Sequence, residues 1–190
     1  NISGGVASDS GLVGLITLSM RNFAIANPPS GLFSAPGEIY RKEAFHGNGE
    51  QFALDLSPGS VVSFWRVMYA FPDVFGTHHN RYMVRSEALN RERRHISHDE
   101  EKAQASLTVA RLFGAGDFSL RVGPRWNSIR IDGLTDPSGS PSTLLNSVGT
   151  TDLRGVSLDL RYSQLDNRMS PREGSHYRWG NTFYGGALGG

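Results

Sequence analysis

The segment Val156-Ser157-Leu158-Asp159-Leu160-Arg161-Tyr162-Ser163 decides the fold, because two kinds of side chain alternate along it. Valine, leucine and tyrosine occupy the even positions, and serine, aspartate and arginine occupy the odd positions. Successive side chains of a β-strand point to opposite faces, so the segment predicts a strand with one apolar and one polar face. Residues 118–127 repeat the pattern, and their polar face again carries arginines.

Further alternating segments extend this interpretation along the chain. Residues 51–56 and 104–109 have the same period of two, and Tyr177, Trp179 and Phe183 end the series. Glycine, proline, asparagine and aspartate between these segments are the residues that tight hairpins need. The sequence predicts about nine antiparallel strands, over residues 1–8, 11–22, 50–57, 60–71, 78–93, 102–112, 117–131, 153–165 and 175–184.

The composition excludes several classes of protein. Hydrophobic residues make up 38% of the 190 residues, and no apolar run approaches the roughly 20 residues of a membrane-spanning helix. The net charge of +1 argues against a nucleic-acid partner. The lack of cysteine excludes disulfides and thiolate metal sites. No nucleophile elbow, phosphate-binding loop or dinucleotide fingerprint occurs, so the chain is predicted to be neither an enzyme nor a cofactor-binding protein.

Two architectures fit the alternation. In a transmembrane β-barrel the apolar row faces lipid and the arginines face a wet interior. In a soluble β-sandwich the apolar row packs on a second sheet and the arginines face bulk water. Strand lengths near the roughly 9 to 11 residues of a tilted membrane strand favour the barrel, as do aromatic residues near predicted strand ends. These are Phe23, Phe71, Phe75, Trp126, Phe183 and Tyr184.

Several motifs resemble a known family. Residues 5–14, with the Arg21-Asn22-Phe23 that follows them, resemble the opening hairpin of the BamA/TamA-type outer-membrane protein assembly factors. Residues 47–50, 57–59 and 70–76 continue the likeness. The most specific part is residues 158–175, with a strand, an Asp-Asn-Arg segment and a Pro-x-x-Gly turn.

The resemblance implies a partial outer-membrane β-barrel over residues 1–190, comprising about nine of the family's sixteen strands. The implied activity is the non-enzymatic folding and insertion, or translocation, of client proteins. The implied partners are outer-membrane lipid, unfolded client proteins and accessory lipoproteins. Two alternatives stay open, a passive porin-like barrel and a soluble β-sandwich binding module.

The resemblance also implies an orientation for the barrel. If the first strand rises from the periplasm, the turns at residues 72–76, 114–117 and 166–174 lie on the periplasmic side, and the polar loops at 95–101 and 132–152 lie outside. One departure from the family is the Pro-, Gly- and Ser-rich segment 24–46, a long inserted loop on the periplasmic side. The other is truncation, because the family's POTRA modules and closing strand are not among these residues.

Three groups of residues are candidate sites. The resemblance assigns a lateral gate to the first strand, whose glycines weaken side-chain packing, and a periplasmic turn motif to the Asp-Asn-Arg segment. Alternation predicts a network of charges in the barrel lumen. The gate comprises Ile2, Gly4, Gly5 and Val6; the turn motif comprises Asp166, Asn167, Arg168, Pro171 and Gly174; the lumen charges are Arg121, Arg125, Asp159, Arg161 and Arg178.

One further cluster has residue types that bind metal ions. His95 and His98 precede the acidic residues 99–101, and nitrogen and oxygen ligands of this kind suit zinc. Arg91, Arg93 and Arg94 are close in sequence and would repel a cation. The cluster is therefore predicted to be a solvated loop, and no metal site is expected.

Overall fold

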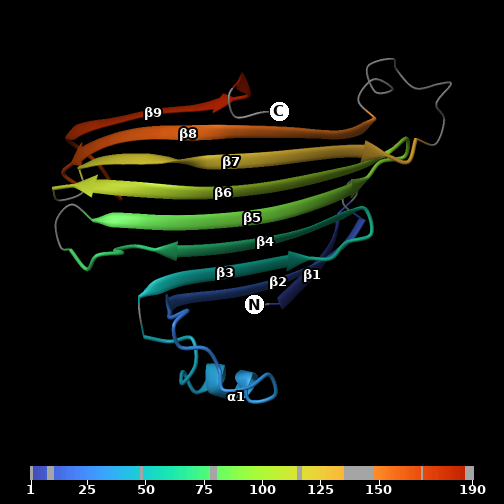
Figure 1. The fold of residues 1–190 in the computed structure, drawn as a ribbon, viewed down its shortest axis with the longest axis horizontal. Helices are drawn as coiled ribbons and strands as arrows, with labels where there is room; N and C mark the ends of the chain where they lie inside the picture. The colour runs from blue at the N-terminus through green and yellow to red at the C-terminus, as the bar shows by residue number, and fades with distance from the viewer. Residues whose placement is uncertain are drawn as a thin grey trace.

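The computed structural model describes residues 2–7, 11–47, 49–77, 81–114, 117–134, 148–167 and 169–186. These residues form nine strands and one short helix (Figure 1). The elements are β1 (Ile2–Ala7), β2 (Gly11–Phe23), α1 (Ala35–Tyr40), β3 (Glu50–Ser57), β4 (Val62–Phe71), β5 (Tyr82–Arg94), β6 (Asp99–Phe113), β7 (Phe118–Asp132), β8 (Gly149–Leu165) and β9 (Gly174–Tyr184).

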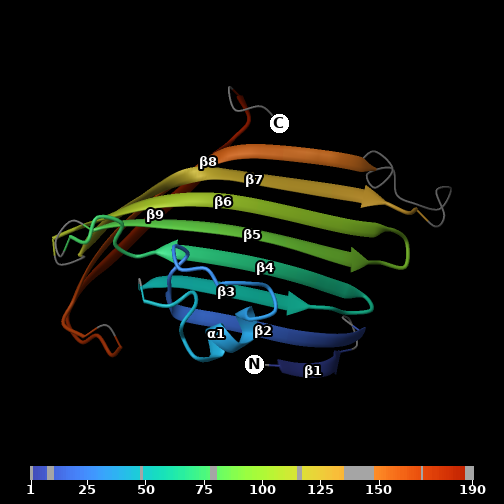
Figure 2. The same ribbon diagram turned by 60° about the horizontal axis from the view of Figure 1, so that its bottom comes forward.

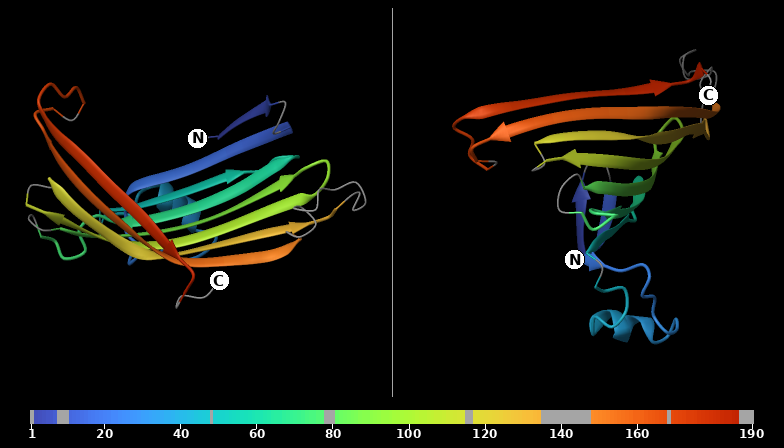
Figure 3. Two further views of the ribbon diagram at one scale, coloured as in Figure 1. Left: turned by 90° about the horizontal axis from the view of Figure 1, so that it is seen from above. Right: turned by 60° about the vertical axis from the view of Figure 1, so that its left-hand side comes forward.

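All nine strands form a single sheet in the order β1-β2-β3-β4-β5-β6-β7-β8-β9, and each strand is antiparallel to its neighbours in sequence. The sheet is curved and twisted, so β9 crosses the direction of the first strands at a steep angle (Figure 3). A β-sandwich needs two packed sheets. The described residues supply one, so the sandwich alternative is wrong.

The strand connections lie at two opposite ends of the sheet. The chain joins β2 to β3, β4 to β5, β6 to β7 and β8 to β9 at the end of the sheet that carries helix α1, here called the α1 end, and it joins the other consecutive strands at the opposite end. The predicted grouping of turns is confirmed. Which end faces the periplasm stays a prediction.

Two strands are longer than predicted, because β6 begins at Asp99 and β8 begins at Gly149. The loop predicted at residues 95–101 is therefore a connection of residues 95–98 only. Asp99 and Glu100 pair with Arg94 and Arg93 across β5. These polar residues show no apolar alternation, which is why the pattern missed them.

The segment 24–46, predicted as a loop, contains helix α1 and is fastened to the sheet by a bridge between Phe23 and His46. Pro36 lies in the first turn of the helix, where its fixed φ angle suits the helix and its missing N–H costs nothing. In Figure 2 helix α1 lies in front of β2 and β3, and Figure 1 shows that it stands off from these strands. No helix among the described residues is long and apolar enough to cross a membrane.

The two faces of the sheet differ in kind. One face, here called the outer face, carries the row Phe71, Val84, Val109, Val122 and Leu158 across β4 to β8. The opposite face, here called the inner face, carries the polar residues of the same strands.

Exposure is inverted relative to a soluble protein. On the outer face Leu18, Val109 and Val122 are 44%, 41% and 41% exposed. On the inner face Asp55 and Asn127 are only 7% and 8% exposed. Soluble domains bury large apolar side chains and expose charged ones. The outer face therefore suits a hydrocarbon environment, and the buried polar residues mark the inner face as the concave one.

The apolar part of the outer face has the length of a membrane-spanning strand. In β7 it runs from Phe118 to Trp126, and Ser128 and Arg130 continue the same face beyond it. The eight steps between these nine residues, at about 3.3 Å each, give a length of roughly 26 Å along the strand. Nine residues match the roughly 9 to 11 residues of a tilted membrane strand. The strands of the sheet's centre thus extend past the band at the end opposite α1.

An aromatic row borders this band at the α1 end. The rings of Phe113 and Phe118 are 5.3 Å apart, and those of Tyr162 and Tyr177 are 6.2 Å apart. The Arg111 guanidinium lies over Phe113 at 4.6 Å from the ring centroid. Aromatic girdles of this kind flank the apolar band of outer-membrane barrels at both interfaces.

Candidate functional site

The first candidate site is strand β1, at one edge of the sheet. It has six residues and pairs with Gly11–Ile16, which are six of the thirteen residues of β2. Gly4 lies opposite Gly14, and Gly5 lies opposite Val13. The predicted gate residues Ile2, Gly4, Gly5 and Val6 thus all lie on a short edge strand. Glycine contributes no packing side chain, and an edge strand offers backbone groups to a further strand.

The second candidate site is a cluster of charges on the inner face of β7, β8 and β9. Arg121 lies opposite Asp159, and Arg161 lies opposite Arg178. Arg178 Nη2 is 3.3 Å from Asp159 Oδ1. Together with Ser119 and His176, these four residues line a cavity of ≈ 240 Å³. Arg125 lines the neighbouring cavity with Asp159 and Arg178. The structure therefore brings all five predicted lumen residues to one face.

This cluster is strongly basic. Four arginines share the surface with Asp159, and the Arg178 side chain remains 66% exposed. Such a surface can hold anions or acidic segments by charge-assisted hydrogen bonds.

Two further ion pairs on the inner face were not predicted. Arg66 Nε donates to Asp55 Oδ2 at 2.9 Å across β3 and β4, and the Asp55 side chain is only 10% exposed. Arg85 and Glu87 on β5 form the second pair at 2.8 Å. Alternation placed Asp55 on the polar face. Its partner depends on the register between strands, which the sequence does not specify.

The turn motif after β8 is ordered by hydrogen bonds from backbone N–H groups to two side chains. The backbone N–H groups of Arg172 and Glu173 donate to Asp166 Oδ1 at 3.0 and 3.2 Å, and those of Met169 and Ser170 donate to Asn167 Oδ1 at 2.8 and 3.3 Å. Donation from Arg172, then from Glu173, holds the pKa of Asp166 below its usual value of 3.8.

Glycine is required at the end of the same turn. Gly174 has a φ of +120°, and a Cβ there would lie 2.1 Å from the Gln164 carbonyl oxygen. Pro171 lies between Ser170 and Arg172, whose backbone N–H groups make two of these hydrogen bonds. Arg168 lies outside the described residues. These hydrogen bonds and the φ angle of Gly174 explain why the residues of the motif have this spacing, since each is needed for the structure of the loop itself. Its relation to the periplasm stays a prediction.

The histidine cluster lies in the tight connection between β5 and β6. The rings of His95 and His98 stack at 4.5 Å, and His95 Nε2 is 3.8 Å from Glu100 Oε2. Their candidate ligand atoms, one from each of the three residues, lie within 4.8 Å of one another. A structural zinc site ordinarily has four ligands, and Arg93 faces Glu100 across the strands. The expectation of a solvated cluster stays a prediction.

Comparisons with known proteins agree with the fold. The chain is 27% identical over 191 residues to the outer membrane protein assembly factor BamA of Neorickettsia risticii (strain Illinois), a match that covers 97% of the chain and 22% of that protein. It superposes on the crystal structure of BamA from Haemophilus ducreyi lacking POTRA domains 1-3, with a TM-score of 0.57 and 14% identity, over 98% of the chain and 34% of that structure. No family model matches the chain.

These likenesses confirm three predictions. The chain resembles the BamA-type family, it has the antiparallel fold of part of an outer-membrane barrel, and its location is the outer membrane. The chain spans 22% of the length of the curated relative, so the activity of a whole assembly factor does not follow from the likeness.

Proposed function

We propose that this chain, similar to BamA in sequence and fold, is part of an outer-membrane barrel that helps client β-barrel proteins fold and insert. Strand β1 acts in this proposal as the labile side of a lateral gate. Its clients are unfolded outer-membrane proteins, and no covalent chemistry is involved.

The observation that carries the proposal is the edge formed by β1. It is a strand of six residues with two consecutive glycines, Gly4 and Gly5, which have no side chain to pack against β2. Its outward edge can exchange backbone hydrogen bonds with an incoming strand, which is the principle of β-augmentation. The strands at the centre of the sheet have 13 to 17 residues and pair on both sides, so they have no such edge.

A passive porin-like barrel is the second candidate, and the basic inner face favours it. Four arginines on that face would select anions in a water-filled pore. Such a pore conducts ions steadily in a planar bilayer, and neutralising Arg121 and Arg178 would reduce its preference for anions. An assembly barrel need not conduct steadily.

The test is photo-cross-linking in the full-length protein that contains this chain. A photoreactive amino acid replaces Ser3 on β1, and a matched control replaces Ser106 at the centre of the sheet on β6. The protein is reconstituted in phospholipid vesicles and supplied with a urea-denatured small outer-membrane β-barrel protein. We expect adducts from position 3 and not from position 106. Equal labelling at both positions, or none at position 3, would contradict the gate.

A further inference from the structure

We propose that the insertion between β2 and β3 is a lipid-binding device that dips into the interfacial region of the membrane. We call residues 24–47 the knob. Its ligand is a phospholipid leaflet, and it binds through the apolar tip formed by Leu32 and Phe33. The inference rests on the proposed membrane barrel, because the outer face must meet lipid for the knob to lie beside it.

The root of the knob is packed against the outer face. The Phe23 ring stacks on Phe45 and on Phe52, both at 5.1 Å, and meets the edge of Tyr69 at 6.3 Å. Phe52 and Tyr69 face each other across β3 and β4 and share the outer face with Leu54 and Val67. The knob is therefore continuous with the apolar band at its α1 end.

Buried polar contacts fix the position of this root. Glu50 is 1% exposed and accepts hydrogen bonds from the Ile25 backbone N–H, at 3.0 Å, and from Tyr69. Ala24 and Ala44 are 5% and 1% exposed beside it. A buried carboxylate with two partners holds the knob in one orientation on the sheet.

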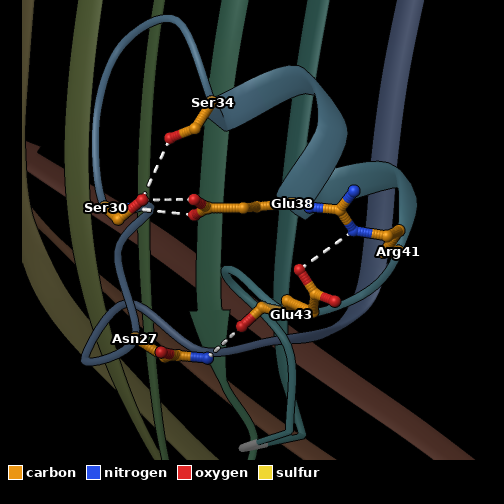
Figure 4. A network of polar contacts seen from close by, with 6 residues as sticks. All are labelled: Asn27, Ser30, Ser34, Glu38, Arg41 and Glu43. Carbon is orange, nitrogen blue, oxygen red and sulfur yellow. Dashed lines mark hydrogen bonds and ion pairs between the residues drawn. The ribbon is translucent and has the colours of Figure 1, made fainter.

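The body of the knob is also ordered by its own polar groups (Figure 4). Ser30 donates to Glu38 through both its backbone N–H and its hydroxyl, and the hydroxyl of Ser34 lies 3.0 Å from that of Ser30. These hydrogen bonds, with that of the Ser30 side chain the largest cause, hold the pKa of Glu38 below its usual value of 4.5. The loop that carries the tip is thus held at both ends.

The tip exposes large apolar side chains to whatever surrounds it. Leu32 and Phe33 are 92% and 103% exposed, and Tyr40 and Ile25 are 88% and 60% exposed. Four such residues close in sequence exceed the scattered apolar exposure that is normal on soluble surfaces. Leucine and phenylalanine on a structured loop, with tyrosine nearby, are the residues that interfacial membrane segments use.

The position of the knob indicates that the ligand of its apolar tip is lipid. In Figure 4 helix α1 lies on one side of the strands and the C-terminal strands cross on the other side. The inner face and the lumen are therefore on the far side of the sheet from α1. The knob lies at the border of the apolar band, where the aromatic row also lies.

The charge of the knob predicts the kind of lipid contact. Glu38 and Glu43 balance Arg41 and Lys42, so the formal net charge from these groups is zero. Arg41 Nε also forms an ion pair with Glu43 at 3.0 Å. Binding should then come from apolar burial, with little dependence on anionic lipid.

The experiment measures the surroundings of three labelled positions in the full-length protein. Native cysteines outside this chain are removed, and the chain itself has none. Phe33→Cys, Leu107→Cys and Ile96→Cys variants carry an environment-sensitive fluorophore in phosphatidylcholine vesicles. Quenching is measured with iodide in the water and with a nitroxide placed high on the lipid chains. Leu107 reports the outer face, and Ile96, 100% exposed at the opposite end, reports water.

We expect the label at position 33 to be quenched by the nitroxide lipid, as at position 107, and to be several-fold less accessible to iodide than the label at position 96. Adding anionic lipid should change the quenching at position 33 by less than about twofold. Leu32→Ser should raise iodide access at position 33, since it removes apolar burial beside the label.

Three outcomes would overturn the inference. A label at position 33 that iodide quenches as at position 96, with position 107 still in lipid, means that the knob lies in water and leaves the membrane barrel intact. A label shielded from both quenchers means that a protein covers the tip. If position 107 is itself open to iodide, the outer face does not meet lipid, and the proposed function fails with the knob.

Discussion

The outer and inner faces of the same strands obey opposite rules. On the outer face, large side chains such as Val109 and Val122 are open, and most residues within the band are apolar, with Ser86 and Arg111 as exceptions. On the inner face, small and polar side chains such as Ala110 and Ser119 are 2% and 6% exposed, and Asp55 and Glu87 each pair with an arginine. Residues one position apart therefore tolerate different substitutions, because one meets hydrocarbon and the next meets water and its neighbours' side chains.

The largest effect is expected from a charge on the outer face. Val109→Arg places a guanidinium near the middle of the apolar band, which should destabilise the folded protein by about 2–4 kcal/mol. The measurement is a urea titration of folding into phospholipid vesicles. Ser106→Arg is the matched control, since residue 106 lies on the inner face opposite Glu87. Equal losses for the two variants would refute the assignment of the faces.

On the inner face, the stability of the protein should be most sensitive to a larger side chain. A Cβ at Gly123 would lie 1.8 Å from the Leu107 carbonyl oxygen, so Gly123→Ala must move the backbone of β6 or β7. We expect a loss of about 1–3 kcal/mol in the same titration. Gly14→Ala is the control, because its Cβ would meet Pro58 at an ordinary 3.5 Å. A neutral Gly123→Ala variant would show that these two strands lie further apart.

The ion pair between Asp55 and Arg66 should have a smaller effect. A double-mutant cycle with Asp55→Ala and Arg66→Ala should give a coupling energy of about 1 kcal/mol, because Arg66 is half exposed while Asp55 is nearly buried. The same cycle on the exposed pair of Arg130 and Asp132, at 2.9 Å, should give less. Equal coupling energies for the two pairs would argue that water reaches the inner face as freely as it reaches the ends of the strands.

The smallest effect concerns pH at the turn after β8. The pKa of Asp166 is lowered in the folded protein, so its stabilisation of the turn is present above pH 3.8 and is lost as the pH falls through the folded pKa. The amide protons of Arg172 and Glu173 should titrate in NMR spectra with a midpoint below 3.8. Asp166→Asn should abolish this transition. A midpoint at or above 3.8 would mean that these hydrogen bonds do not favour the carboxylate.

Period-two alternation predicted the strands well because each face of the band is close to uniform, mostly apolar outside and mostly small or polar inside. It failed where that uniformity ends. The first residues of β6 and β8 lie beyond the band, so their outer face is polar, as at Asp99 and Asp152. Helix α1 escaped prediction because its six residues show no apolar period and are ordered by distant partners such as Ser30.

The candidate site was predicted in part. Alternation placed the five lumen charges on one face, as the register confirms. The pairing of Asp159 with Arg178 and of Asp55 with Arg66 depends on strand register, which is set by contacts along whole strands. The role of β1 as a gate came only from a family likeness and stays a proposal.

The order of the strands has a consequence for how this sheet can form. Every strand lies beside its neighbours in sequence, so no strand must wait for a distant partner, and most hairpins close through short connections. The longest closure is the one that spans the knob, between Phe23 and Glu50. The stacked rings of Phe23, Phe45 and Phe52 shorten it by joining its two ends. Assembly can therefore proceed hairpin by hairpin. At the knob, the stacked aromatic rings hold β3 close to β2, so that the two strands can pair in the correct register.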